Sequence, residues 1–142
     1  MTDLQAALGL SQMARLDEFV ASRHLLARRY DEKLDGLPVV TPRQHRDSYS
    51  GLHLYVIRLK LAESTRSHRQ VFEALRAEEI GVNLHYIPVY RQPYYEGLGF
   101  KAGYCPQAEL YYAEAISLPL YPDLSLSEQD KVLEVLTGVV LS

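Results

Sequence analysis

The feature that most constrains the fold is an amphipathic helical pattern over the first 35 residues. Thr2 and Gln5 have the spacing of a capping box, so a helix can begin almost at the first residue. Apolar side chains then recur at intervals of three and four, at Leu16, Phe19, Val20, Leu26, Ala27, Tyr30 and Leu34. Gly36 and Pro38 follow in the order that ends a helix. One helix of about 50 Å exceeds what a compact chain of this size needs, so we expect part of it to pack on something outside these residues.

Shorter elements follow along the 142 residues. In order, we expect an edge strand at 37–40, a largely buried strand at 49–60, an amphipathic helix at 64–79, a strand at 82–87, a loop or short helix at 89–104, a helix from Pro106 to about Ala115, a strand at 117–122, and a helix from the Ser125 cap to Val140. This order predicts an α/β (α+β) two-layer sandwich, with a small, mostly antiparallel sheet and helices on one face.

Charge and cysteine content exclude several classes. Fifteen Lys and Arg against eighteen Asp and Glu give a net charge of −3, which disfavours a nucleic-acid reader. We expect no membrane span, because no apolar run approaches 18 residues, and the first 20 residues do not resemble a signal peptide. Cys105 is the single cysteine, so we expect an inert thiol, no disulfide framework and no cysteine zinc site. A cytoplasmic domain is the expectation.

The densest polar and aromatic segment begins at His85, where a predicted strand becomes a loop. His85 could bind a ligand or transfer a proton near neutral pH. Tyr86, Tyr90 and Tyr95 could stack on a sugar or a base, and Arg91 could fork onto a phosphate. The alternative is that these tyrosines pack over the sheet with their hydroxyls satisfied locally. The residues alone leave both readings open.

Other chemically competent residues give weaker signals. The remaining histidines are His24, His45, His53 and His68. None forms an i, i+4 pair or joins a carboxylate cluster, so we expect no metal site. Arg23, Arg28 and Arg29 are expected to form a solvated face of the first helix.

Four stretches carry a resemblance to a known family. They are residues 1–12, the strand His53-Leu-Tyr-Val-Ile-Arg58, the segment Ile80-Gly-Val-Asn-Leu-His-Tyr-Ile-Pro-Val89, and Ala115-Ile-Ser-Leu-Pro-Leu-Tyr-Pro122 before a capped helix. Together they resemble the C-terminal part of the DegT/DnrJ/EryC1/StrS sugar-nucleotide aminotransferases, which are pyridoxal phosphate (PLP) enzymes of the aspartate-aminotransferase (type I PLP) fold. The sequence of 85–95 looks most like the pseudaminic-acid branch, whose members use glutamate to aminate C4 of a UDP-linked 4-keto-6-deoxy-N-acetylhexosamine.

The resemblance implies a domain assignment. Residues 1–36 match the long helix that links the family's two domains, and 37–142 match its small C-terminal domain. The family's PLP lysine belongs to the large domain, and the lysines here, Lys33, Lys60, Lys101 and Lys131, lie in no such motif. We therefore expect the complete enzyme to use PLP, a UDP-sugar and glutamate as a homodimer. This chain alone is expected to bind no PLP and not to transaminate.

The resemblance also implies substrate contacts, and no catalytic, cofactor-binding or metal residue. His85, Tyr86, Ile87 and Pro88 match the stretch that approaches the substrate sugar in the family. Tyr90, Arg91 and Gln92 continue toward the nucleotide, and Tyr95 closes the pocket. The alternatives are an aminotransferase for another keto sugar, such as a 3-keto or dTDP-linked one, a non-catalytic nucleotide-sugar-binding or dimerisation domain, and a gene remnant without function.

Overall fold

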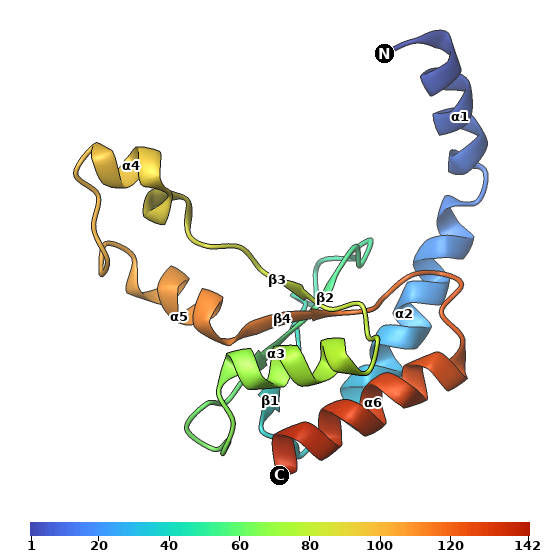
Figure 1. The fold of residues 1–142 in the computed structure, drawn as a ribbon. Helices are drawn as coiled ribbons and strands as arrows, with labels where there is room; N and C mark the ends of the chain where they lie inside the picture. The colour runs from blue at the N-terminus through green and yellow to red at the C-terminus, as the bar shows by residue number, and fades with distance from the viewer.

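A four-stranded sheet lies at the centre of the chain, in a computed structural model that describes residues 1–142. The strands are β1 (Val39–Val40), β2 (Tyr55–Leu59), β3 (Asn83–Leu84) and β4 (Ala115–Leu118). They are ordered β1-β2-β4-β3, and every neighbouring pair is antiparallel (Figure 1). The predicted α/β class with a small antiparallel sheet is confirmed.

Three helices cover one face of this sheet. They are α2 (Leu16–Lys33), α3 (His68–Ala77) and α6 (Leu126–Leu141) (Figure 1). The predicted Ser125 capping box is present, and Ser67 with Gln70 forms a second one that starts α3. The core between helices and sheet is a single cluster that includes Tyr30, Ile57, Val71, Ile116 and Leu136. The helices are therefore held by burial of one apolar stripe each.

The strands are shorter than their sequence patterns. The strand expected at 49–60 begins at Tyr55, because Leu52 has φ +45° and turns the chain before the ladder can form. The strand expected at 82–87 is limited to Asn83–Leu84, and Tyr86 at φ +23° redirects the chain. The strand expected at 117–122 starts directly after a helix, at Ala115, and stops before Pro119, which has no N–H to donate.

Helix α3 is also shorter than expected. It begins at His68 and not at 64, because the Ser67 side chain accepts the Gln70 N–H and fixes the start. It ends at Ala77, because Glu79 has φ +62° and breaks the helical path. Residues 64–66 therefore lie in the loop before α3, and 78–79 form a turn after it.

The single helix expected over 1–36 is wrong, because it is divided in two. Helix α1 (Asp3–Met13) is separated from α2 at Arg15, whose φ of −109° and ψ of 6° leave the helical range. The Arg15 guanidinium binds Glu18 at 3.3 Å and lies 4.5 Å from the centre of the Phe19 ring, so it marks the start of α2. No residue of α1 is buried, and Figure 1 shows it extending away from the sheet. Nothing packs on α1 to keep the two helices in line.

The prediction that Arg23, Arg28 and Arg29 form a solvated face is wrong for Arg29, which binds two residues of α6. Its guanidinium donates to Oε1 of the buried Gln129 at 3.0 Å and also binds Asp130 on α6. Gln129 in turn donates to the Leu26 carbonyl of α2 at 2.8 Å. Arg28 is exposed, whereas Arg23 is half-buried and its Nε has no partner. Part of this arginine set therefore joins α2 to α6.

Residues 85–114, which we call the arm, leave the sheet after β3 and return at β4. The arm contains the 3-10 turn η1 (Val89–Arg91), α4 (Pro93–Gly97) and α5 (Pro106–Glu114). The short helix expected within 89–104 and the helix expected from Pro106 are confirmed. Figure 1 shows α4 at the far end of the arm, near α5 and well away from α2, α3 and α6. None of the chain's helices combines the length and apolar character needed to cross a membrane.

Candidate functional site

His85 lies at the foot of the arm, immediately after β3. Its half-buried ring meets the Tyr111 ring of α5 edge-on, with centroids 5.5 Å apart and planes at 77°. The Tyr86 ring lies 5.6 Å away on another side. The His85 side chain makes no hydrogen bond, so both ring nitrogens remain available to a ligand.

Tyr86, Ile87 and Pro88 lie in the irregular segment that leads from β3 into the arm. Tyr86 has a backbone φ of +23°, which is strained for a residue with a side chain, and its side chain is 80% exposed. Ile87 is also exposed, and Pro88 precedes the η1 turn. Strain of this kind concentrates at ligand-binding positions. The structure thus brings these residues together with His85 on one exposed surface.

Tyr90 and Arg91 are engaged within the arm by Glu109 of α5. The Tyr90 hydroxyl donates to Glu109 Oε1 at 2.6 Å, and the Gly103 N–H donates to the same oxygen at 2.7 Å. Arg91 Nε binds Glu96 at 3.0 Å, and its Nη1 lies 3.9 Å from Glu109. The polar groups of Tyr90 and Arg91 are therefore satisfied within the arm, as in the alternative interpretation of the sequence.

The Glu109 contacts shift the proton affinities of both partners. The hydrogen bond from Tyr90 and the Gly103 N–H hold the pKa of Glu109 below its usual value. Desolvation and the hydrogen bond to Glu109 raise the pKa of Tyr90. At neutral pH the arm therefore contains an ionised carboxylate that accepts from a neutral hydroxyl. Sequence reasoning missed Glu109, and its place in the first turn of a helix begun by Pro106 was the available signal.

Gln92 and Tyr95 lie farther along the arm. Gln92 is the residue that precedes α4. The Tyr95 ring packs edge-on against Tyr94 at 5.3 Å and Phe100 at 6.3 Å, and Phe100 packs on Tyr104 at 5.0 Å. These rings form an aromatic cluster on the arm that is largely exposed. The predicted contact residues thus divide into two groups. The side chains of 85–88 make no hydrogen bond within the arm, whereas Tyr90, Arg91 and Tyr95 contact other residues of the arm and stabilise its shape.

Lowering the pH should protonate Glu109 and weaken its hydrogen bonds with Tyr90 and Gly103. The folded pKa is lowered, so the stabilisation is present above the usual carboxyl pKa of 4.5 and is lost as pH falls through the lowered folded value. We expect the Gly103 amide resonance in NMR to titrate with a midpoint below 4.5, and Glu109→Gln to abolish that titration. Glu134→Gln, on an exposed residue of α6, should leave it unchanged. A Gly103 titration that survives Glu109→Gln would show that another group controls the arm.

The lysines do not fit a cofactor site. A PLP enzyme holds its cofactor through a lysine amine placed beside the reacting carbon. Lys33, Lys60, Lys101 and Lys131 are all exposed and lie on separate parts of the fold, and Lys60 is paired with Glu63 at 3.5 Å. No group of three His, Cys, Asp or Glu side chains could hold a metal ion. We therefore derive no PLP step from these residues.

Comparison with known proteins gives consistent matches over the whole chain. The sequence profile of the DegT/DnrJ/EryC1/StrS aminotransferase family matches residues 1–137. The chain is 38% identical to the spore coat polysaccharide biosynthesis protein SpsC of Bacillus subtilis (strain 168), over 99% of this chain and 37% of SpsC.

Solved structures show the same relationship. The PLP-form of Spr1654 from Streptococcus pneumoniae matches with a TM-score of 0.90 and 29% identity, over 99% of this chain and 36% of that one. Helicobacter pylori PseC, an aminotransferase involved in the biosynthesis of pseudoaminic acid, matches with a TM-score of 0.89 and 26% identity, over 99% of this chain and 38% of PseC. The chain thus spans a little over a third of each of these proteins.

Proposed function

This chain belongs to the DegT/DnrJ/EryC1/StrS aminotransferase family, and from that membership we propose that it is part of a PLP-dependent enzyme that aminates a nucleotide-linked keto sugar. The proposed acceptor is C4 of a UDP-linked 4-keto-6-deoxy-N-acetylhexosamine, with glutamate as donor. The similarity to PseC and to SpsC supports a role in pseudaminic-acid or other surface-polysaccharide synthesis. The PLP- and PMP-forms of Spr1654 support the cofactor.

Residues 1–36 are proposed to link this small domain to a larger one that carries the PLP lysine. The exposed apolar side chains of α1, including Leu4, Leu8 and Met13, support this role because an isolated helix gains nothing from exposing them. The extra length of the relatives supports it independently. We propose a homodimer for the complete enzyme. Its PLP supplies the electron sink for amino transfer.

The observation that carries the site proposal is His85, with free ring nitrogens on an exposed surface. We assign His85, Tyr86, Ile87 and Pro88 to the sugar. Tyr90, Arg91, Gln92 and Tyr95 lie on the arm beyond it, and the contacts of Tyr90 with Glu109, of Arg91 with Glu96 and of Tyr95 with Phe100 position that surface. These residues bind and orient the substrate, and we assign no proton transfer to them.

The proposal is tested by incubating the protein that carries this chain with PLP, glutamate and the UDP-4-keto sugar. Mass spectrometry should detect the amino sugar together with 2-oxoglutarate. A parallel reaction with a dTDP-linked 4-keto sugar and with a 3-keto sugar identifies the acceptor. If neither the UDP-linked nor the dTDP-linked sugars were aminated, the result would contradict the aminotransferase assignment.

A second candidate is a non-catalytic domain that binds a nucleotide sugar. The observation that favours it is the scatter of the four exposed lysines, which suits no PLP chemistry within these residues. This candidate predicts that the 142-residue chain binds a UDP-sugar in calorimetry but does not turn it over. Turnover by the 142-residue chain alone would exclude it.

Tyr86→Ala should weaken nucleotide-sugar binding by about tenfold, because a stacked aromatic contributes on the order of 1 kcal/mol beyond its buried area. Tyr94→Ala is the matched control, since Tyr94 is 73% exposed on the same arm but lies outside the assigned contacts. Calorimetry with the UDP-sugar on both variants makes the comparison. Equal losses at the two positions would place the sugar elsewhere on the arm.

A further inference from the structure

The sheet face opposite the helices contains a hollow that the site above does not include. Val56 and Arg58 alternate with the buried Tyr55, Ile57 and Leu59 along β2, so they face away from the core. The hollow has a volume of about 420 Å³. Its lining combines apolar side chains, Val40, Leu54 and Val56, with polar ones, Arg43, Arg58 and Tyr111. A pocket with an apolar lining and a few convergent polar groups is the usual form of a small-molecule site.

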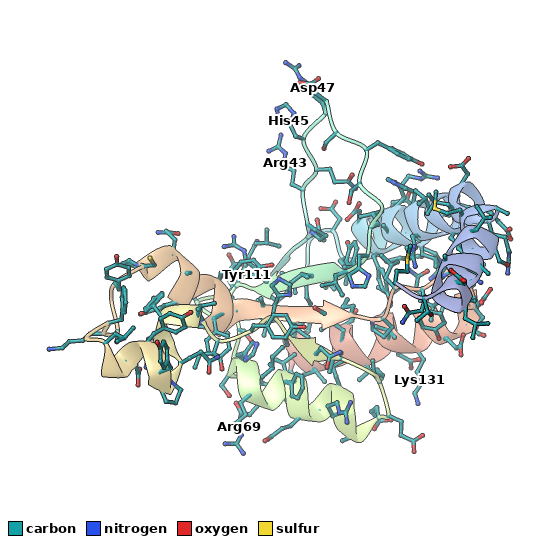
Figure 2. All side chains as sticks on the ribbon, turned by 90° about the horizontal axis from the view of Figure 1, so that it is seen from above. Arg43, His45, Asp47, Arg69, Tyr111 and Lys131 are labelled. Atoms are coloured by element: carbon teal, nitrogen blue, oxygen red, sulfur yellow. The ribbon has the colours of Figure 1, made fainter.

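The region around this hollow is positively charged in a chain of net charge −3. Residues 41–60 contain four Arg and Lys but one acidic residue, Asp47. Asp47 lies 3.5 Å from His45, and Lys60 is paired with Glu63. Figure 2 shows Arg43, His45 and Asp47 on a loop that projects from one side of the sheet, whereas Arg69 and Lys131 lie on the other side.

Arg43 is the free cation at the mouth of the hollow. It makes no ion pair or side-chain hydrogen bond, and it also borders a neighbouring hollow of about 520 Å³ formed by 43–46. Arg58 lines the same hollow from β2 and is half-buried, with one contact to Glu114 at 3.6 Å. Two guanidinium groups with unused donors offer the forked geometry that phosphate oxygens accept.

Tyr111 lies between the hollow and the sugar surface. The Tyr111 ring borders the hollow on one side and contacts His85 at 5.5 Å on the other. Arg91, the phosphate candidate from the sequence, is already bound to Glu96 and lies near Glu109. We infer that Arg43 and Arg58 bind the diphosphate of the nucleotide-linked sugar on this outer sheet face. This inference rests on the proposed function and adds the two arginines that bind the diphosphate of the substrate.

The test measures binding of inorganic pyrophosphate, UDP and uridine to the 142-residue chain by calorimetry. Pyrophosphate and UDP should bind saturably, with uridine about tenfold weaker or more. Arg43→Gln and Arg58→Gln should each weaken pyrophosphate binding by about tenfold, the effect of losing a charge-assisted hydrogen bond. Arg58→Lys should recover only part of the loss, because lysine keeps the charge but not the fork. Arg69→Gln, on the opposite side, should change the affinity by less than about twofold.

Two outcomes would overturn the inference. One is the absence of saturable pyrophosphate binding at about 10 mM, where even a millimolar site is occupied. The other is an equal loss in the Arg43→Gln and Arg69→Gln variants, which would indicate attraction by overall charge alone. Circular dichroism melting curves confirm that each variant is folded. The binding measurement needs no PLP and no amino donor. Failure of the pyrophosphate site and failure of the proposed amino transfer are therefore detected separately.

Discussion

Leu136→Ala should lower the free energy of unfolding by about 2–5 kcal/mol. The Leu136 side chain is fully buried on α6, within the cluster where helices α2, α3 and α6 meet the sheet. Truncation removes its transfer free energy and leaves a cavity that the surrounding side chains of the cluster cannot fill without moving. Urea unfolding followed by circular dichroism measures the loss.

The matched control for this substitution lies on the same helix. Leu126 is 61% exposed at the start of α6, so Leu126→Ala should change the unfolding free energy by less than about 0.5 kcal/mol. Comparable losses at both positions would mean that the loss at Leu136 does not come from its burial, because alanine has the higher helix propensity and an exposed Leu→Ala change should cost little. A small loss at Leu136 alone would mean that α6 is not packed as described.

Gln129→Leu should destabilise the chain by about 1–3 kcal/mol, although leucine is the more apolar residue. The fully buried Gln129 donates to the Leu26 carbonyl at 2.8 Å and accepts from Arg29 at 3.0 Å. Leucine removes both contacts and leaves the Arg29 guanidinium, which is partly buried, with one acceptor fewer. Thermal unfolding with calorimetry measures the effect.

Asp130→Asn provides the comparison for Gln129. Asp130 binds the same arginine, but its side chain is 60% exposed, and exposed ion pairs contribute little. We expect a loss of less than about 1 kcal/mol, and one that shrinks further at high salt. If Asp130→Asn were the more damaging substitution, the α2–α6 contact would depend on the ion pair and not on the buried amide.

The elements that could be predicted from sequence are those whose signals are local. The capping boxes at Thr2 and Ser125 are both formed, because each needs only residues three positions apart. The strand limits could not be predicted in this way. They depend on left-handed backbone at Leu52 and Tyr86, which no composition signal marks in residues with large side chains.

The break between α1 and α2 was missed for a related reason. The apolar periodicity continues across Arg15, so the pattern alone indicates one helix. The structure shows no buried residue in α1, and a helix without packing follows its local hydrogen bonds rather than the pattern. The exposed apolar side chains agree with the expectation that this segment needs a packing partner.

The candidate site could be located from sequence but not resolved into roles. The position of the segment that begins at His85, on a loop after a strand, follows from local signals. The role of Tyr90 depends on Glu109, which lies 19 residues away and meets it through the fold of the arm. Arg43 and Arg58 are likewise brought to one hollow by the fold, so neither stood out in the sequence.

The insertion point of the arm has a consequence for how this fold can vary. Leu84 and Ile116 lie opposite each other on adjacent antiparallel strands, so the arm is the connection of a hairpin whose two ends are neighbours. The entropy of closing such a connection grows only slowly with its length. The arm's polar contacts at Glu109 close within it, and the β2–β4 ladder is complete without it. The segment between β3 and α5 can therefore change in length without rebuilding the core, whereas Tyr111 and Glu114 of α5 stay tied to the outer face of β2.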